Sequence, residues 1–183
     1  MPGICLSFDK KSNDYLTKLY KKINNIYKKE IIKINNDLIP HISLLRTKYN
    51  ETENKYIYKA IDIITKNNKK YFIYLQGVGI FKKTDKYVIY LSISYDENMQ
   101  KVHKELWKKL DGVIPDYERD NYHYSSFVPH ITIPLPKTNK TTVYKVLDEL
   151  LKINLKKIKL KINGLTYLTG NLDTPEIYYK KSF

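Results

Sequence analysis

Apolar residues recur along this chain with two spacings, one typical of strands and one typical of amphipathic helices. Short runs of β-branched, aliphatic and aromatic residues predict strands, and apolar positions three or four residues apart predict helices. Strands are predicted over residues 4–8, 40–45, 71–81, 87–94, 129–133, 156–168 and 176–180, and helices over residues 12–27, 52–67, 97–110 and 138–152. The expected helix caps are Ser12 or Asn13, Asp96, and Thr138 or Asn139.

Several segments interrupt this pattern. Residues 31–36 fit neither spacing, residues 47–50 and 82–85 are polar connections, and residues 111–127 form the longest irregular stretch. A loop of that length in a compact domain is more often functional than idle. Gly77 and Gly79 interrupt a predicted strand, which indicates a bulge or the close approach of another backbone segment.

Two tripeptides in matching surroundings are the main functional feature of the sequence. They are His41-Ile-Ser43 and His130-Ile-Thr132, and each lies between a proline and an aliphatic residue. Because residues i and i+2 of a strand point to the same face, each histidine projects beside its hydroxyl residue. Two such pairs around one small anion supply two groups that titrate near neutral pH and two neutral hydrogen-bond donors.

The two tripeptides also begin matching stretches of chain. Each is followed by a helical pattern, a strand that contains glycine, a few polar residues and a further strand. Gly77 lies 36 residues after His41, and Gly164 lies 34 residues after His130. This spacing predicts an internal duplication, with a pseudo-two-fold axis across which the two histidine strands meet.

The composition suits one domain, or two small lobes that share a core, because 42% of the 183 residues are hydrophobic. A net charge of +14 favours a polyanionic partner such as RNA or a nucleotide. All basic residues except Arg46 and Arg119 are lysines, and Asn, Ile and Tyr are abundant. An AT-rich coding sequence would give the same bias, so a solvated lysine surface is the alternative reading of the charge.

The cysteine content and the termini bear on location. Cys5 is the single cysteine and lies in an apolar run, so we expect it in the core. No intrachain disulfide can form, which favours a reducing compartment. The sequence has no apolar stretch of membrane-spanning length, and its N-terminus lacks the basic start of a signal peptide. We therefore expect an intracellular monomer, cytoplasmic or nuclear, without membrane contact.

The paired tripeptides suit phosphodiester chemistry. Cleavage or cyclisation needs a base for the attacking oxygen and an acid for the leaving oxygen, and His41 and His130 meet both needs if one is neutral and one charged. Ser43 and Thr132 would bind the non-bridging oxygens. The sequence has no metal-ligand spacing and no complete glycine-rich phosphate loop, so we expect neither a metal nor a cofactor.

In these features the chain resembles the 2H phosphoesterase superfamily, and within it the 2′-5′ RNA ligase-like and cyclic phosphodiesterase branch. The resemblance rests on the two His-x-Ser/Thr tripeptides, the apolar first strand, the duplicated order of elements and the lead-in over residues 127–132. It implies one α+β domain over residues 1–183. Two pseudo-symmetric lobes, each an antiparallel-rich sheet with helices packed outside, would enclose a central groove.

The same resemblance implies metal-independent hydrolysis or transesterification of 2′,3′-cyclic phosphates, 2′-5′ linkages or 3′-end diesters in RNA or nucleotides. By motif position, His41 and His130 would be the acid/base pair, and Ser43 and Thr132 would hold the phosphate. Residues 41–47 also resemble the first motif of the U6 RNA-trimming phosphodiesterases, which belong to the same superfamily. The sequence does not assign which histidine is the acid.

Other residues are weaker candidates for substrate contact. Arg46 lies three residues past Ser43 and faces the opposite side of a continuous strand, so it reaches substrate only if the strand ends first. Aromatic side chains in the irregular stretch can stack on a base, with packing as the alternative role. These side chains are Tyr122, His123, Tyr124 and Phe127. Lysines 152, 156, 157, 159 and 161 would follow an RNA backbone or form a solvated face.

Two further functions stay open at this point. A non-catalytic RNA-binding module would keep the groove but bind RNA without cutting it. An enzyme with the same chemistry would instead destroy 2′-5′-linked or cyclic oligonucleotide signals in an immune conflict.

Overall fold

The computed structural model describes residues 3–26, 39–47, 51–82, 87–114, 123, 125–135, 140–170 and 175–183. Strands and helices alternate along the chain and form an α+β fold, as the resemblance implied. Their order is β1 (Gly3–Phe8), α1 (Lys10–Ile26), β2 (His41–Arg46), α2 (Glu51–Asn67), β3 (Tyr71–Lys82), β4 (Tyr87–Ile93), α3 (Glu97–Lys109), β5 (His130–Thr132), α5 (Lys140–Leu151), the 3₁₀ helix η1 (Leu155–Lys157), β6 (Lys159–Gly170) and β7 (Pro175–Ser182).

The seven strands of the described residues belong to one antiparallel sheet, and the strand order is symmetric about its centre. The order is β2-β1-β6-β3-β4-β5, and β7 pairs with β6. Exchanging the two ends of this order exchanges β2 with β5, β1 with β4 and β6 with β3. The chain repeats accordingly, as β1-α1-β2-α2-β3 followed by β4-α3-β5-α5-β6. The matching of β4 with β7 that the sequence suggested is therefore wrong, because β4 takes the place opposite β1 and β7 is an additional strand.

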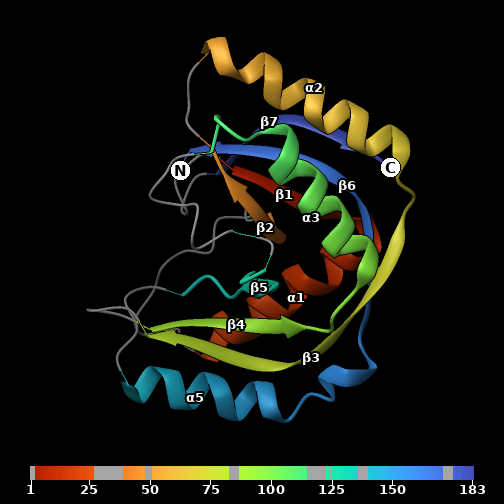
Figure 1. Ribbon diagram of the computed structural model, residues 1–183. Helices are drawn as coiled ribbons and strands as arrows, with labels where there is room; N and C mark the ends of the chain where they lie inside the picture. The colour runs from red at the N-terminus through yellow and green to blue at the C-terminus, as the bar shows by residue number, and fades with distance from the viewer. Residues whose placement is uncertain are drawn as a thin grey trace.

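Two of the helices lie outside the sheet at opposite ends of the molecule. α2 contacts β6 and β7, and α5 contacts β3 and β4, at the top and bottom of Figure 1. β2 and β5, the two ends of the strand order, contact each other between these layers. The sheet thus brings together the two strands that begin with the candidate histidines.

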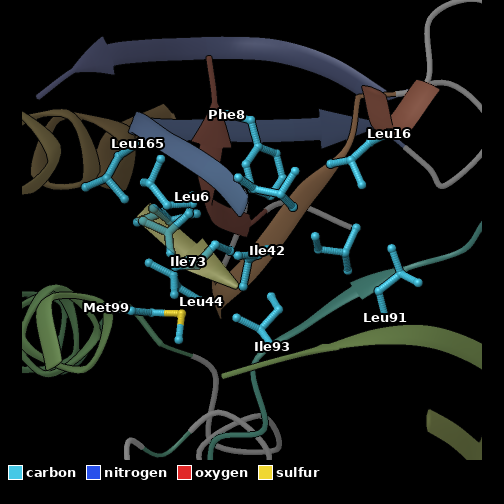
Figure 2. Packing of buried hydrophobic residues seen from close by; sticks show 14 of the residues in the cluster. Leu6, Phe8, Leu16, Ile42, Leu44, Ile73, Leu91, Ile93, Met99 and Leu165 are labelled. Atoms are coloured by element: carbon cyan, nitrogen blue, oxygen red, sulfur yellow. The ribbon is translucent and has the colours of Figure 1, made fainter. Parts of the chain in front are cut away.

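One apolar core joins the strands to the helices, and it decides which side chains are left for a site. Alternate residues of the strands point into the core, and helices α1 and α3 add side chains to it (Figure 2). Figure 2 labels Leu6 and Phe8 of β1, Ile42 and Leu44 of β2, Ile73 of β3, Leu91 and Ile93 of β4, Leu165 of β6, Leu16 of α1 and Met99 of α3. A shift of one residue would turn a strand's apolar set away from the core, so burial fixes the register.

The structure corrects the predicted start of the first helix. α1 begins at residue 10, because the Asp9 carboxylate Oδ1 accepts a hydrogen bond from the backbone N–H of Ser12 at 2.8 Å. Asp9 is therefore the cap, rather than Ser12 or Asn13. Asp96 caps α3 as predicted, since its carboxylate accepts from the backbone N–H of Met99 at 2.9 Å.

The remaining predicted elements agree with the structure except near the last strands. Residues 155–157 form η1, so β6 begins at residue 159 rather than at 156. The predictions for residues 31–36, 48–50 and 83–85, for residues 115–122 of the irregular stretch, and for the caps Thr138 and Asn139 lie outside the described residues.

Candidate active site

His41 and His130 make the same backbone contact at the first positions of β2 and β5. Nδ1 of His41 lies 2.7 Å from the carbonyl oxygen of Ile39, and Nδ1 of His130 lies 2.8 Å from that of Val128. A carbonyl oxygen only accepts hydrogen bonds, so Nδ1 carries a proton in both rings. In the neutral form of either ring, Nε2 is then the atom that accepts a proton.

Each histidine stands beside its hydroxyl residue, as strand geometry requires. His41 and Ser43 are partly exposed around a fully buried isoleucine, and His130 and Thr132 repeat this arrangement in β5. Alternate residues of a strand share a face. Both tripeptides therefore present an imidazole and a hydroxyl on the side of the sheet opposite the core.

The two tripeptides lie close to each other in space. β2 contacts β5, and the positive charge of His41 acts on the titration of His130. Tyr20 of α1 ties the second tripeptide to that helix, because its hydroxyl donates to the carbonyl oxygen of Thr132 at 2.9 Å. The structure thus brings His41, Ser43, His130 and Thr132 to one region from strands almost 90 residues apart in sequence.

Equivalent cross-strand rows lead away from the two histidines. His41 pairs with Ser7 of β1, which pairs with Gly164 of β6. His130 pairs with Ser92 of β4, which pairs with Gly77 of β3. Paired residues of an antiparallel sheet share a face, so each imidazole has a small serine and then a glycine beside it. The two rows are therefore equivalent in size as well as in register.

The surroundings of His41 favour its charged form. Burial lowers the pKa of His41, but the Cys5 sulfur, within hydrogen-bonding reach of the ring, and the Ile39 carbonyl outweigh burial and raise the pKa to about 9. Cys5 pairs with Ser43 across β1 and β2, so it lies on the same face as His41 and diagonal to it. His41 is therefore protonated at neutral pH.

The surroundings of His130 favour its neutral form. Burial lowers the pKa of His130 below its ordinary value of 6.5, and the positive charge of His41 lowers it further, against the opposing effect of the Val128 carbonyl. His130 is therefore neutral at neutral pH, with its free Nε2 able to accept a proton. Two groups in equivalent positions thus differ in charge.

A β-bulge decides where Arg46 lies. Ser43 pairs with Cys5 while Leu45 pairs with Ile4, so the register shifts by one residue at Leu44. Arg46 then pairs with Gly3, which is on the same face of β1 as Cys5. The expectation that Arg46 faces away from Ser43 is wrong for this reason. Bulges redirect side chains in this way beside active sites.

Two aromatic rings flank His130 on the other side of the site. Phe81 and Tyr90 stack with ring centroids 4.2 Å apart, and both approach the His130 ring edge-on at 5.0 and 5.2 Å. The Tyr90 ring lies directly over Gly79, where an added Cβ would overlap the atoms of that ring. The absence of a side chain at Gly79 leaves space for the Tyr90 ring, and the Tyr90 ring packs edge-on against His130.

Comparison with known proteins places the chain in a family. Residues 17–173 match the profile of the 2′-5′ RNA ligase superfamily, which is well over half of the sequence. The chain belongs to the 2′-5′ RNA ligase superfamily. No curated protein matches the chain by sequence.

Solved structures support the same fold for this superfamily member. TT0787 of Thermus thermophilus superimposes with a TM-score of 0.67 at 13% identity, over 99% of this chain and 96% of that one. Usb1 of Kluyveromyces marxianus gives 0.53 at 13%, over 96% of each chain. LigT of E. coli, in complex with 3′-AMP, gives 0.51 at 10%, over 99% of this chain and 96% of LigT. The 2H phosphoesterase fold predicted from the sequence is confirmed.

The weaker aromatic candidates lie against α3 where the structure describes them. The His123 ring packs edge-on against Trp107 at 5.0 Å, and its Nδ1 lies 2.6 Å from the Ser125 hydroxyl. Phe127 packs against His103, with ring centroids 4.2 Å apart. Tyr122 and Tyr124 lie outside the described residues. Packing thus accounts for the described contacts of His123 and Phe127, and their contact with substrate stays a prediction.

The sequence interpretation missed the residues that lie beside the two tripeptides. Cys5 is buried as predicted, but it also contacts His41. Ser7, Tyr90 and Ser92 pair directly with tripeptide residues. A signal was present, because Cys5-x-Ser7 and Tyr90-x-Ser92 are polar i, i+2 pairs inside otherwise apolar strands.

The described residues also bear on metal binding and on membrane insertion. Among them, no group of three or more His, Cys, Asp and Glu side chains is arranged to hold a metal ion. No helix in the described part of the chain is both long and apolar enough to cross a bilayer.

Proposed function

We propose that this protein is a metal-independent phosphodiesterase that acts on RNA or nucleotide phosphodiesters by two-histidine acid/base catalysis. The substrate classes are 2′,3′-cyclic phosphates, 2′-5′ linkages and 3′-end diesters. One observation carries the proposal: two equivalent imidazoles, each tied through Nδ1 to a carbonyl oxygen, lie on strands that contact each other. Their pKa values shift in opposite directions, which favours one charged and one neutral ring. Such a pair supplies a base and an acid at the same time.

The opposite directions of the two pKa shifts support an assignment of the roles. His130, neutral, is the general base, and His41, charged, is the general acid. In the opening of a 2′,3′-cyclic phosphate, His130 takes a proton from water as the water oxygen bonds to phosphorus. One ring P–O bond breaks, and His41 gives its proton to the departing ribose oxygen. Proton exchange with solvent then restores both histidines.

The neighbouring groups suit the phosphate. Ser43 and Thr132 share faces with the histidines, so their hydroxyls would donate to the non-bridging oxygens, whose charge rises in the transition state. Arg46, turned to the same face by the bulge, adds a guanidinium with two parallel N–H donors. Acid, base and anion-binding groups are thus supplied by side chains.

One structural relative supports this substrate class. LigT of E. coli has been crystallised with 3′-AMP, with phosphate and with ATP. Phosphate-bearing adenine nucleotides occupy that protein, and we extend the same ligand class to this superfamily member. The extension rests on the shared fold together with the four tripeptide side chains.

The test is an incubation in EDTA with a short RNA that ends in a 2′,3′-cyclic phosphate. Wild type should open the ring, and His41→Ala or His130→Ala should lower the rate by about 10²-fold or more. The position of the product phosphate identifies the departing oxygen. The same assay is carried out with 2′-5′-linked oligonucleotides and with 3′-end diesters. The preferred substrate then distinguishes RNA processing from the destruction of nucleotide signals.

Each outcome has a definite meaning. Cleavage that survives both histidine changes contradicts the mechanism. RNA that binds tightly but is never cut in any of these assays contradicts the enzyme proposal and favours the non-catalytic binding module.

A further inference from the structure

A second surface of this protein has the composition of a nucleic-acid site. Phe72 and Tyr74 of β3 are 45% and 46% exposed, although the residues between and beside them are buried in the core. On the neighbouring strand β6, Lys161 pairs with Phe72 and Lys159 pairs with Tyr74. We call these four residues the aromatic–lysine patch.

The lysines of the patch lie over its rings. Nζ of Lys159 is 4.0 Å from the centroid of Phe72 and 5.6 Å from that of Tyr74, and Nζ of Lys161 is 5.7 Å from that of Phe72. Further exposed lysines adjoin the patch along the chain. They are Lys69 and Lys70 before β3, and Lys156 and Lys157 before β6.

Two bulges place the patch on the same sheet face as both histidines. Leu75 pairs with Ile93 and Gly77 with Ser92, so the bulge at Gln76 puts Gly77 on the face of Tyr74. Gly77 begins the row that ends at His130. The patch therefore continues, on one face of β3, into the site of the second tripeptide.

A bulge also connects β6, the other strand of the patch, to the row of the first histidine. Ile162 pairs with Phe8 and Gly164 with Ser7, so the bulge at residue 163 puts Gly164 on the face of Lys161. Gly164 begins the row that ends at His41. β3 and β6 are the two central strands of the pseudo-symmetric order, so the patch lies midway between the two histidine strands in that order.

We propose that the aromatic–lysine patch binds the single-stranded RNA next to the bond that is cleaved. The enzyme would then prefer oligonucleotides to mononucleotides. Exposed rings on a sheet stack with unpaired bases, and flanking lysines neutralise the backbone phosphates. Stacking of a base on a ring is worth more than an exposed cation–π contact, so a base can displace the ammonium group toward a phosphate. The net charge of +14 supports an anionic occupant.

This inference rests on the proposed function for its choice of RNA, so binding and cleavage are measured separately. Binding uses fluorescence anisotropy with a labelled single-stranded RNA that ends in a 3′-phosphate. Cleavage uses a cyclic-ended oligonucleotide beside a 2′,3′-cyclic mononucleotide. The variants are Phe72→Ala/Tyr74→Ala and Lys159→Gln/Lys161→Gln, all at exposed or half-exposed positions, with thermal unfolding measured for each.

The matched control is Tyr144→Ala/Lys140→Gln on α5. Nζ of Lys140 lies 5.9 Å from the Tyr144 centroid and the ring is 56% exposed, so this pair has the same chemistry on a different element. The aromatic variant should raise the RNA Kd and the oligonucleotide KM by about tenfold or more. The lysine variant should reduce the slope of log K against log salt by about 0.7 per lysine. The control should change neither.

Turnover of the cyclic mononucleotide should be unchanged in both patch variants, because it does not reach the patch. If both bind and cleave RNA like wild type while remaining folded, the patch is not an RNA site and the inference is overturned. A wild type that cleaves nothing but loses RNA binding in the patch variants would contradict the proposed function and leave the patch supported.

Discussion

His41 and His130 donate Nδ1–H to carbonyl oxygens two residues earlier in their own segments, at 2.7 and 2.8 Å, yet their pKa values move in opposite directions. The carbonyl contact favours the charged form of both rings. The difference comes from Cys5, which lies beside His41, and from the charge of His41, which acts on His130. One buried neighbour thus makes a pseudo-symmetric pair chemically unequal.

This inequality predicts a bell-shaped dependence of kcat/KM on pH. Activity should rise as His130 loses its proton, at a pH below 6.5, and fall as His41 loses its proton near pH 9. The plateau between the two limbs is the range in which the base is neutral and the acid is charged. A profile from about pH 4 to pH 10 measures both limbs. A narrow bell centred on the ordinary histidine value of 6.5 would disagree with the two shifts.

Replacement of Cys5 should move only the alkaline limb. The sulfur raises the pKa of His41, so Cys5→Ala should lower that pKa and shift the alkaline limb to lower pH. Cys5→Ser keeps a hydrogen-bonding side chain of similar size beside the ring and should give an intermediate shift. Thr166→Val is the matched control, because Thr166 is buried and pairs with Cys5 on its other side. An alkaline limb that stays in place in Cys5→Ala would show that the sulfur has no influence.

Gly79 and Gly77 provide a matched test of the aromatic support of His130. A Cβ at Gly79 would overlap the Tyr90 ring, whereas a Cβ at Gly77 would meet only the Ser92 hydroxyl, at 3.7 Å. Gly79→Ala should therefore displace Tyr90 from its stack and lower kcat by about tenfold, which is ~1.4 kcal/mol in the barrier. Gly77→Ala should stay near wild type in steady-state kinetics. Equal effects of the two changes would remove the role assigned to the ring.

Arg46 should act on substrate binding rather than on proton transfer. Arg46→Gln should raise KM by about tenfold and leave both limbs of the pH profile unchanged, because the guanidinium binds phosphate but does not titrate in this range. Arg46→Lys should recover part of the loss, since it keeps the charge and loses the two-point geometry. If Arg46→Gln has the same KM as wild type at low salt, the Arg46 side chain does not contact the substrate.

The sequence was sufficient for features that depend on local spacing. The strand alternation around His41 and His130 and the capping of α3 by Asp96 follow from contacts within a few residues. The glycines also pointed to the bulge in β3, because a glycine inside an apolar strand commonly marks one. The close approach to Gly79 is made by the Tyr90 side chain rather than by the backbone segment that the pattern indicated.

Features that depend on register between distant strands could not be read from the sequence. The position of Arg46 follows from a register shift of one residue between β1 and β2, which no local sequence pattern predicts. The contact of Cys5 with His41 likewise needs the pairing of β1 with β2. The acid/base assignment depends on that contact, and for this reason the sequence left it open.

The unequal charge of the two histidines is tested most directly by a pH titration of the imidazole nitrogens by NMR, with 15N-labelled histidine and no substrate. The protein has four histidines, so His41→Ala and His130→Ala assign the two signals. We predict a proton on Nδ1 of neutral His130, a midpoint below 6.5 for His130, and a midpoint near 9 for His41. Midpoints that coincide, or that are reversed, would contradict the claim that the pair is held as base and acid at neutral pH.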